Sequence, residues 1–389
     1  MKKICFVIQR YGLEVNGGAE TLCRELAERM CGRYDVEVLT TRAIDYMTWK
    51  DEYKSDEEII SGVKVRRFSV KKERHRKAFN AINRVFKMGL LPEFMEYRWL
   101  VEQGPYTPEL IDYIRRNKDA YDVFIFVTYL YYPTVLGVSE VADKAIVLPL
   151  AHDEPFLRMK IFNPVFTSPR AFLFETEEER DLARSRFECT HIPYHLGGSG
   201  VEIPSAVCAE DFKTKYGLDN YIIYAGRIDD GKNCPELFEF FLRYKKENGG
   251  NLKLVLLGKS VIDIPDSEDI VSLGFVSEKD KFDGMAGAKL LVMPSKYESL
   301  SIVVLEAFSL GVPVLVNGEC AVLKGHCDKS GGGLYYTSYD EFQAGLKKLV
   351  GDEKLMASMG QRGNVYVSER FNWNKICDNL AELIEMVAG

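Results

Sequence analysis

Apolar residues form two patterns that alternate along this chain. Short, almost continuous apolar runs are typical of buried strands, and apolar residues at helical spacing between charged ones are typical of amphipathic helices. This alternation predicts parallel sheets covered by helices on both faces. Strands are expected at 3–9, 36–40, 120–128, 145–150, 170–176, 221–225, 251–258, 270–274, 290–293, 312–316 and 333–336. Helices are expected at 19–30, 78–88, 177–186, 235–248, 279–287, 301–310, 339–350, 353–370 and 374–387.

One stretch interrupts this alternation. Residues 191–204 hold three glycines and two prolines without a helical period, which is typical of a linker between domains. A chain of 389 residues is also long for a single core. We therefore expect two α/β domains, each with a doubly wound parallel sheet. The first covers 1–203 and is joined by the C-terminal helix at 374–389, and the second covers 204–373.

Composition and charge narrow the class of protein. The chain is 46% hydrophobic and 28% charged, as globular proteins are, and its net charge of −7 argues against a nucleic-acid binder. Its nine cysteines contain no CxxC pair, and no cluster with metal-ligand spacing occurs, so reduced thiols and no metal site are expected. No apolar run reaches the roughly 18 residues of a membrane span, and the apolar start is too short for a signal peptide. A cytoplasmic protein is expected.

A basic segment stands out in this acidic protein. Residues 64–87 contain ten Lys or Arg and one acid, Glu73, and the helix expected at 78–88 carries Phe79, Ile82 and Phe86 at helical spacing. One interpretation is a peripheral contact with anionic lipid at the inner face of a membrane, or with an anionic acceptor. The other is a solvated helix whose apolar side packs on its own domain.

Two acidic residues flank a helix start between two apolar runs. Glu298 and Glu306 are eight residues apart, which on one helix is ~80° off a common face and ~12 Å of rise, so they would not act on one atom. They could instead hold the two ends of an elongated ligand, with a phosphate at the helix N-terminus near residue 301. The alternative is two solvated carboxylates. Glu306, however, lies in the apolar string IVVLEAF, and a charge on a mostly buried helix needs a partner.

Two further candidates follow predicted strands of the first domain. Gly17 and Gly18 come where the first strand leads into a helix, and glycine there lets the backbone approach a ligand closely. The alternative is a plain turn, since neither GxGxxG nor GxxxxGK[ST] is present. His152 follows the strand at 145–150, where open α/β sheets bind ligands, although a lone His is more often structural.

Several motifs together resemble a known enzyme family. Gly226-Arg227-x4-Lys232 opens the second domain, Glu298-x7-Glu306 follows later, and 305–313 reads LEAFSLGVP. With the early Gly-Gly and the closing phrase GNVYVSERFNW, this resembles the retaining glycosyltransferases of family 4 (glycosyl transferases group 1). The resemblance implies the GT-B fold, in which two Rossmann-like domains face each other across a cleft.

The chain departs from the family pattern at two places. The glycine that commonly follows the first Glu is absent, since Glu298 is followed by Ser299, Leu300 and Ser301. The usual G-G-x-x-E segment is replaced by 317–333, which suggests a different loop. Because the backbone N–H groups after Glu298 remain, donor binding is still expected without that glycine, although the sequence does not give the identity of the sugar.

The resemblance assigns roles to individual residues. Arg227 and Lys232 would neutralise the pyrophosphate of a nucleotide sugar in place of a metal, with no other cofactor. Glu306 would accept hydrogen bonds from the ribose, and Glu298 from the donor sugar. The remaining donor contacts would come from Gly17 and Gly18 near the phosphates, Phe275 and Val276 near the base, and Ser299, Leu300 and Ser301 through N–H groups. His152 would touch the sugar near the reacting carbon, which makes Glu298, His152, Arg227 and Lys232 the expected catalytic set.

The expected activity is transfer of a sugar, with retention of configuration, from a nucleotide sugar to a hydroxyl of a saccharide or lipid-linked acceptor. The expected setting is bacterial polysaccharide or glycoconjugate synthesis. One alternative is a nucleotide-sugar epimerase on the same scaffold, but the first domain offers one well-placed His and no paired carboxylates. Another is a non-catalytic protein that binds a nucleotide sugar. Such a protein would have no physical need for buried charges at all of Arg227, Lys232, Glu298 and Glu306.

Overall fold

The computed structural model describes residues 1–389 with the exception of 16 and 90. The chain divides into two compact units: Met1–Gly198 together with Asn374–Gly389, and Ser199–Trp373. The sequence-based boundary after residue 203 lies a few residues beyond this division. Each predicted strand and each predicted helix is present, with ends shifted by a few residues at most.

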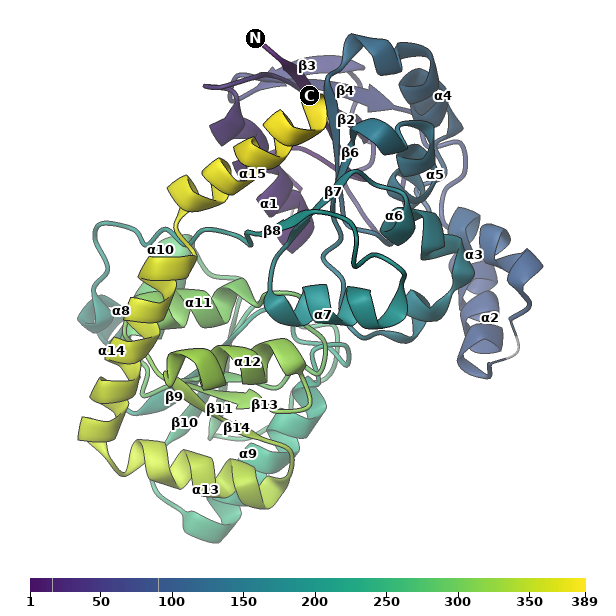
Figure 1. Ribbon diagram of the computed structural model, residues 1–389. Helices are drawn as coiled ribbons and strands as arrows, with labels where there is room; N and C mark the ends of the chain where they lie inside the picture. Colours follow the sequence, from purple (N-terminus) through teal and green to yellow (C-terminus); the bar gives the residue numbers. More distant parts are fainter. Residues whose placement is uncertain (16, 90) are drawn as a thin grey trace. The chain divides into compact units, whose positions relative to one another are not determined.

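The first unit contains an eight-stranded sheet in the order β3-β4-β2-β1-β5-β6-β7-β8 (Figure 1). Neighbouring strands are parallel except β3 and β4, which form an antiparallel hairpin at one edge. The strand order reverses beside β1, which has β2 as its neighbour on one side and β5 on the other. The strands are β1 (Lys3–Val7), β2 (Asp35–Thr41), β3 (Glu57–Ile60), β4 (Val63–Phe68), β5 (Val123–Val127), β6 (Ala145–Leu148), β7 (Ala171–Phe174) and β8 (Tyr194–Leu196).

Helices cover this sheet because its strands are apolar on both faces; all five residues of β5, VFIFV, are buried. The last helix, α15, belongs to this unit from Asn374 onward. It is held by bonds from Lys2 and Tyr34 to Glu385, at 2.7 and 2.9 Å. The helices are α1 (Gly18–Met30), α2 (Arg76–Lys87), α3 (Glu96–Gln103), α4 (Pro108–Asn117), α5 (Tyr132–Glu140), α6 (Asn163–Thr167), α7 (Glu177–Arg186) and α15 (Trp373–Ala388).

The second unit contains a six-stranded, wholly parallel sheet in the order β11-β10-β9-β12-β13-β14. The strand order reverses between β9 and β12, because the chain first builds outward to β11 and then returns to the other side of β9. Open α/β sheets bind ligands at the carboxyl ends of the strands beside such a reversal. The strands are β9 (Tyr221–Ala225), β10 (Lys253–Leu257), β11 (Ile270–Gly274), β12 (Leu291–Met293), β13 (Val314–Asn317) and β14 (Gly333–Tyr336).

Seven helices of the second unit surround this sheet in the described chain. Their bounds are α8 (Ala209–Tyr216), α9 (Cys234–Asn248), α10 (Glu278–Gly287), α11 (Ile302–Ser309), α12 (Ala321–Ser330), α13 (Tyr339–Val350) and α14 (Glu353–Arg370). α14 lies directly against the end of α11: a Cβ at Gly360 would be 1.8 Å from the carbonyl oxygen of Gly311. Only glycine allows so close an approach, and α11 is thereby braced from behind.

The prediction of a loop across 317–333 is wrong. Residues 321–330 form α12, whose Val322, Leu323 and Cys327 are buried in the core of the unit. The prediction of a linker across 191–204 also needs correction, since β8 lies inside that stretch as the edge strand of the first sheet. A strand of only three half-buried residues leaves too weak a pattern to stand out beside three glycines.

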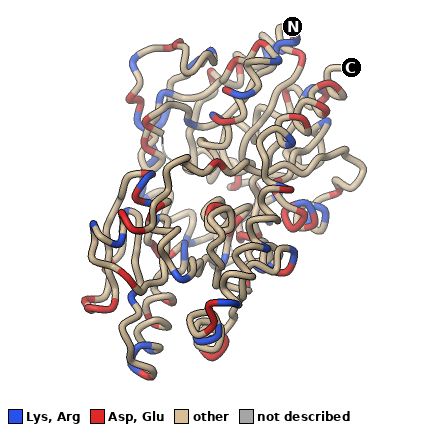
Figure 2. The backbone as a smooth tube through the Cα atoms, turned by 90° about the vertical axis from the view of Figure 1, so that its left-hand side faces the viewer, with Lys and Arg blue, Asp and Glu red and all other residues tan. Residues whose placement is uncertain are grey.

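The basic segment at 64–87 is not one structure. Its first residues form β4, where Arg66 pairs with Glu37 at 3.0 Å and Arg67 is 2% exposed and pairs with Glu58. On α2, Ile82 is buried and the Phe86 ring stacks on Phe156 with centroids 4.9 Å apart. The apolar side of this helix therefore packs on its own unit. Over the backbone as a whole, Figure 2 shows Lys and Arg interspersed with Asp and Glu.

In the described chain, every helix is too short or too polar to cross a lipid bilayer.

Candidate functional site

Two loops meet where the strand order of the second sheet reverses. One follows β9 and begins with Gly226 and Arg227, and the other follows β12 and runs over 294–301. A Cβ at Gly258, after β10, would be 1.9 Å from the carbonyl oxygen of Gly226, and Gly258 has φ +138°. Glycine is required there so that the loops after neighbouring strands can approach one another.

An ion pair joins these two loops. Lys232 Nζ lies 2.8 Å from Glu298 Oε1, and the Glu298 side chain is only 11% exposed. Asp229 supports the arrangement: its Oδ1 accepts the backbone N–H of Lys232 at 2.8 Å, and its other oxygen pairs with Arg227. The structure thus brings three of the predicted site residues into one charged cluster, and Asp229 is a member that the sequence did not reveal.

Two asparagine side chains tie the same loops together. Asn233 has left-handed backbone (φ +57°) immediately before α9, and its amide donates to the carbonyl oxygen of Pro294 at 3.2 Å. Asn317, at the end of β13, donates to the same oxygen at 3.1 Å. Left-handed backbone at a residue other than glycine costs free energy and is concentrated at functional sites. The end of β9 and the end of β12 are therefore held in fixed register with β13.

Glu306 lies in the second turn of α11. Its side chain is 12% exposed and pairs with Lys281 of α10, with Nζ 2.7 Å from Oε1. Burial raises the pKa of the Glu306 carboxyl, and the nearby ammonium of Lys281 opposes that rise. Lys281 is thus the partner that a carboxylate in an apolar helix was expected to need.

The segment between Glu298 and α11 has unusual backbone. Ser301 adopts φ +64° directly before the first residue of the helix, and its buried hydroxyl has no hydrogen-bond partner among the described residues. Leu300 is buried, with its carbonyl turned toward α12. The free N–H groups of the first turn of α11 follow this strained residue. The predicted contacts of Ser299, Leu300 and Ser301 therefore belong to a loop of fixed shape.

A buried histidine holds Leu300 in place. His326 of α12 is 1% exposed, its Nε2 lies 2.7 Å from the Leu300 carbonyl oxygen, and its Nδ1 lies 3.0 Å from the Tyr366 hydroxyl. Burial lowers the pKa of His326 to about 4, so the ring is neutral. Because a carbonyl only accepts, Nε2 carries the proton and Tyr366 donates to Nδ1. These two hydrogen bonds were not predicted from the sequence, because His326 lies in the stretch that was expected to form a loop.

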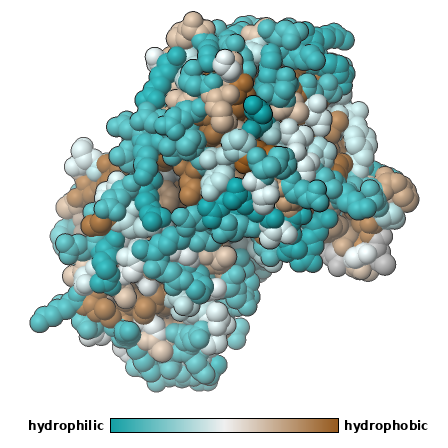
Figure 3. All heavy atoms as spheres, viewed as in Figure 1, coloured by the Kyte–Doolittle hydropathy of each residue, from teal (hydrophilic) through white to brown (hydrophobic). Residues whose placement is uncertain are grey.

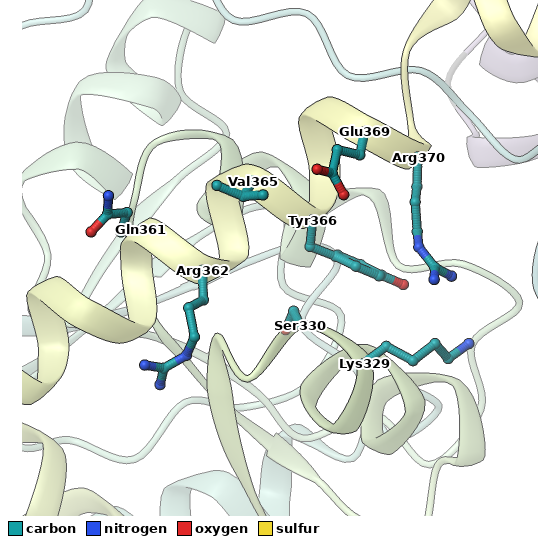
Figure 4. Close-up of a pocket in the computed structure, with 8 residues that line it drawn as sticks. All are labelled: Lys329, Ser330, Gln361, Arg362, Val365, Tyr366, Glu369 and Arg370. Atoms are coloured by element: carbon teal, nitrogen blue, oxygen red, sulfur yellow. The ribbon is translucent and has the colours of Figure 1, made fainter.

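A hollow of about 400 Å³ lies between α12 and α14, and Tyr366 is one of the residues that line it. Figure 4 shows the Tyr366 ring reaching from α14 toward α12, with Lys329 and Arg370 at its tip. None of the residues predicted for the site line this hollow, so it is a separate feature of the second unit. Its lining residues are Lys329, Ser330, Gln361, Arg362, Val365, Tyr366, Glu369 and Arg370.

Phe275 and Val276 follow β11 at the same edge of the sheet. The Phe275 side chain is 84% exposed, whereas Val276 packs against the core. The next residue, Ser277, caps α10, since its Oγ accepts the N–H of Asp280 at 3.1 Å. One helix therefore connects the segment predicted to contact the base with Lys281 and, through it, with Glu306.

Three predicted site residues belong to the first unit. Gly17 precedes α1, and a Cβ there would lie 2.1 Å from Glu20 Oε2, while Gly18 has open space around it. Glu20 is buried and accepts from Arg10 Nη2 at 2.6 Å, a pair that the sequence did not reveal. His152 follows β6, with Nε2 3.7 Å from Glu154 Oε1.

The backbone is also strained at this edge of the first sheet. Thr128 after β5 has φ +65°, and Leu150 after β6 has φ +53°. Two left-handed residues on neighbouring strand ends carry a free-energy cost that the surrounding contacts must offset. The loop with His152 therefore starts from a backbone of fixed shape.

No group of three or more His, Cys, Asp or Glu in the described part of the chain is arranged to hold a metal ion. The positive charges at the second-unit site include those of Arg227, Lys232 and Lys281.

Part of the second unit is similar to a known protein family. Residues 209–365 match the family model described as Glycosyl transferases group 1. The capsular polysaccharide biosynthesis glycosyltransferase CapM of Staphylococcus aureus is 26% identical over 179 residues, 42% of this chain and 46% of CapM. The match thus spans less than half the length of that relative. Together with the fold, these matches support a group 1 glycosyltransferase.

Solved structures of glycosyltransferases share the whole architecture. Sucrose-phosphate synthase from Thermosynechococcus elongatus has 15% identity, covers 100% of this chain and 99% of its own, and has a TM-score of 0.71. Anabaena HepE in complex with UDP and glucose has 15% identity, covers 99% and 100%, and has a TM-score of 0.70. Trehalose 6-phosphate synthase from Burkholderia multivorans has 11% identity, covers 100% and 99%, and has a TM-score of 0.73. At these identities the likeness shows the fold alone, and the GT-B fold class predicted for this chain is confirmed.

The neutral His326 predicts a pH dependence of stability. The folded pKa near 4 is below the ordinary value of 6.5, so the unfolded chain binds a proton that the folded chain excludes between these values. The stabilisation is complete above pH 6.5 and decreases as the pH falls toward 4, by up to about 3 kcal/mol. Urea unfolding at pH 7 and pH 5 should show a smaller pH-dependent loss in His326→Gln, which keeps an N–H donor but does not titrate. Equal losses in the two proteins would contradict this account of His326.

Proposed function

We propose that this protein is a retaining glycosyltransferase of family 4 that transfers a sugar from a nucleoside-diphosphate sugar to a hydroxyl of an acceptor. The observation that carries the proposal is the Lys232–Glu298 pair at 2.8 Å, where the strand order of the second sheet reverses. A saccharide or lipid-linked acceptor in polysaccharide or glycoconjugate synthesis is proposed, with support from CapM, whose name places it in capsular polysaccharide biosynthesis.

The donor pyrophosphate would be bound by side-chain cations. Two phosphates carry negative charge, and the leaving phosphate gains more as the bond to the sugar breaks. Arg227 and Lys232 can neutralise this charge, and the N-terminus of α11 adds N–H groups and the positive end of a helix dipole. In this proposal these groups take the place of a metal ion, and the nucleotide sugar is a substrate with no cofactor beside it.

The two acidic residues would bind the two ends of the donor. Glu298, next to Lys232, would accept hydrogen bonds from hydroxyls of the sugar, and Glu306 would accept them from the ribose. The unpaired hydroxyl of Ser301 lies between them in sequence and is suited to bind a polar group of the donor. Because Lys232 is shared between Glu298 and the phosphate, the sugar and the leaving group would be oriented together.

The nucleobase would lie against Phe275 and Val276. The exposed Phe275 ring offers a flat apolar face on which a base can stack. Anabaena HepE, which shares this fold, was solved with UDP and glucose, and this supports a nucleotide-sugar donor for the present chain.

In the first unit, Gly17 and Gly18 are proposed to approach the donor phosphates through their backbone. His152 is proposed to touch the donor sugar near the reacting carbon. In the transfer, the bond from the sugar carbon to the phosphate oxygen breaks and a bond to the acceptor oxygen forms on the same face. The acceptor proton passes to the departing phosphate, so no protein base is required at that step. The first unit would supply the acceptor site.

A cytoplasmic location is proposed from the cysteines. All nine are free, and seven of them are buried. Free thiols in this number are typical of a reducing compartment.

We further propose a peripheral contact with anionic lipid through the α2–α3 surface, defined by Arg76, Lys77, Arg84, Met88, Phe94 and Tyr97. The first three are exposed cations, and the last three are exposed apolar side chains, with Phe94 82% exposed. Figure 3 shows apolar side chains over α2 and α3 at the right-hand end of the view. Exposed aromatic residues beside cations suit the headgroup region of an anionic bilayer.

The donor site is tested by removing its charges. Lys232→Ala and Glu298→Ala should each lower kcat/KM for the nucleotide sugar by at least ~100-fold, about 3 kcal/mol of transition-state stabilisation, while circular dichroism stays unchanged. Lys324→Ala and Asp328→Asn are matched controls, because they break an exposed ion pair on α12 and should keep activity.

Full transferase activity in either Lys232→Ala or Glu298→Ala would refute the site. An epimerase would instead release an altered nucleotide sugar without an acceptor, and a binding protein would retain the donor without turnover.

The lipid contact is tested with vesicles. The protein should sediment with vesicles that contain phosphatidylglycerol, less so in high salt, and not with pure phosphatidylcholine. Arg76→Glu with Lys77→Glu should abolish sedimentation, and so should Phe94→Asp. Lys347→Glu with Lys348→Glu, an equal charge change on α13, should not. Equal sedimentation with both kinds of vesicle, or equal loss in the control, would contradict a lipid contact.

A further inference from the structure

The pair between Lys281 and Glu306 is not explained by the roles proposed so far. Lys281 lies on α10, outside every motif of the sequence, yet its Nζ is 2.7 Å from Glu306 Oε1. Both side chains are mostly buried, at 29% and 12% exposure. Because a largely buried ion pair contributes little net stability, stability alone does not account for this contact.

Most of the other charged residues of α10 pair with groups other than Glu306. Lys279 pairs with Asp211 and Asp283, and Asp280 pairs with Lys215 at 2.9 Å. These pairs tie α10 to α8 and to itself. Lys281 alone among the described residues of this helix is paired to a carboxylate on α11.

The start of α10 determines where Lys281 lies. Ser277 caps the helix immediately after Val276, and the N–H of Lys281 donates to the carbonyl oxygen of Ser277 at 2.9 Å. The ammonium also lies 4.4 Å from the centre of the Phe282 ring. The aliphatic stem is thus fixed within one turn of the segment proposed to contact the base.

Lys281 favours the charged form of Glu306, because its ammonium lies next to the carboxylate. The charged groups that act on it are Lys281, which favours the carboxylate, and Glu278, which opposes it; both belong to α10. Only a carboxylate can accept hydrogen bonds with both oxygens, whereas a protonated acid has one oxygen that donates. Without Lys281, burial and Glu278 would both favour the protonated acid.

We propose that Lys281 is a positioning residue that presents Glu306 as a carboxylate to the ribose of the donor. Lys281 stays on Oε1 when the donor is bound, and Oε2 accepts from the ribose hydroxyls. The inference rests on the proposed role of Glu306 in donor binding. It makes recognition of a ribonucleotide over its deoxy counterpart depend on a residue that does not touch the nucleotide.

The test measures binding of UDP, GDP and their 2′-deoxy counterparts by calorimetry at pH 6 and pH 8.5. Lys281→Gln should weaken binding of the preferred ribonucleotide by ~10-fold at pH 6, the size of one charge-assisted hydrogen bond, and by less at pH 8.5. The loss is larger at pH 6 because a carboxyl with a raised pKa is protonated as the pH falls. Binding of the 2′-deoxy counterpart, which keeps only the 3′-hydroxyl, should change less, and Lys281→Arg should restore ribonucleotide binding.

Two further variants separate this inference from the proposed function. Lys215→Gln removes a different ion pair from α10 and should bind as the unaltered protein does. The double variant Lys281→Gln, Glu306→Gln should bind as Glu306→Gln alone does, because Lys281 acts only through Glu306.

The outcomes are distinct. If Glu306→Gln weakens binding and Lys281→Gln does not at either pH, the inference fails and the proposed function stands. If Glu306→Gln binds the ribonucleotide normally, or if neither UDP nor GDP binds the unaltered protein, the proposed donor site fails and the inference fails with it.

Discussion

The ion pair between Lys232 and Glu298 is the interaction on which the second unit's site depends. It joins the loop after β9 to the loop after β12. These are the two strands between which the strand order of the sheet reverses. A largely buried carboxylate next to a lysine is stable only while both partners are present, because either one alone would be an uncompensated charge. The pair therefore keeps the two loops in contact and holds the Lys232 ammonium beside Glu298.

The rest of the second unit acts as a rigid support for this pair. Asp229 orients both Arg227 and the backbone of Lys232, and Asn233 and Asn317 hold the Pro294 carbonyl. Behind the site, His326 holds Leu300 and α14 braces α11. Preorganised charges of this kind stabilise a developing negative charge without rearranging when the reaction occurs.

Much of this could be predicted from the sequence, because strand and helix patterns are local. Arg227, Lys232 and Glu298 were predicted as one site from the family resemblance of their motifs. Their loops come together because parallel strands end at one edge of a sheet. Lys281 could not be singled out, because it is one of several charged residues in EKDK and only the fold shows which of them reaches Glu306. His326 was missed because α12 carries too few periodic apolar residues to be recognised. β3 and β4 were not predicted, because their charged residues read as a solvated surface in the sequence. Only the fold shows that these charges pair across the two strands.

The central claim is that the donor diphosphate binds at the strand ends of the second unit between Arg227, Lys232, Glu298 and Glu306. Hydrogen–deuterium exchange of the intact chain, with and without saturating UDP or GDP, tests it most directly. The account predicts slower exchange in peptides that cover 226–234 and 298–306, with little change in α13. Slower exchange confined to other parts of the chain, with these two segments unaffected, would contradict it.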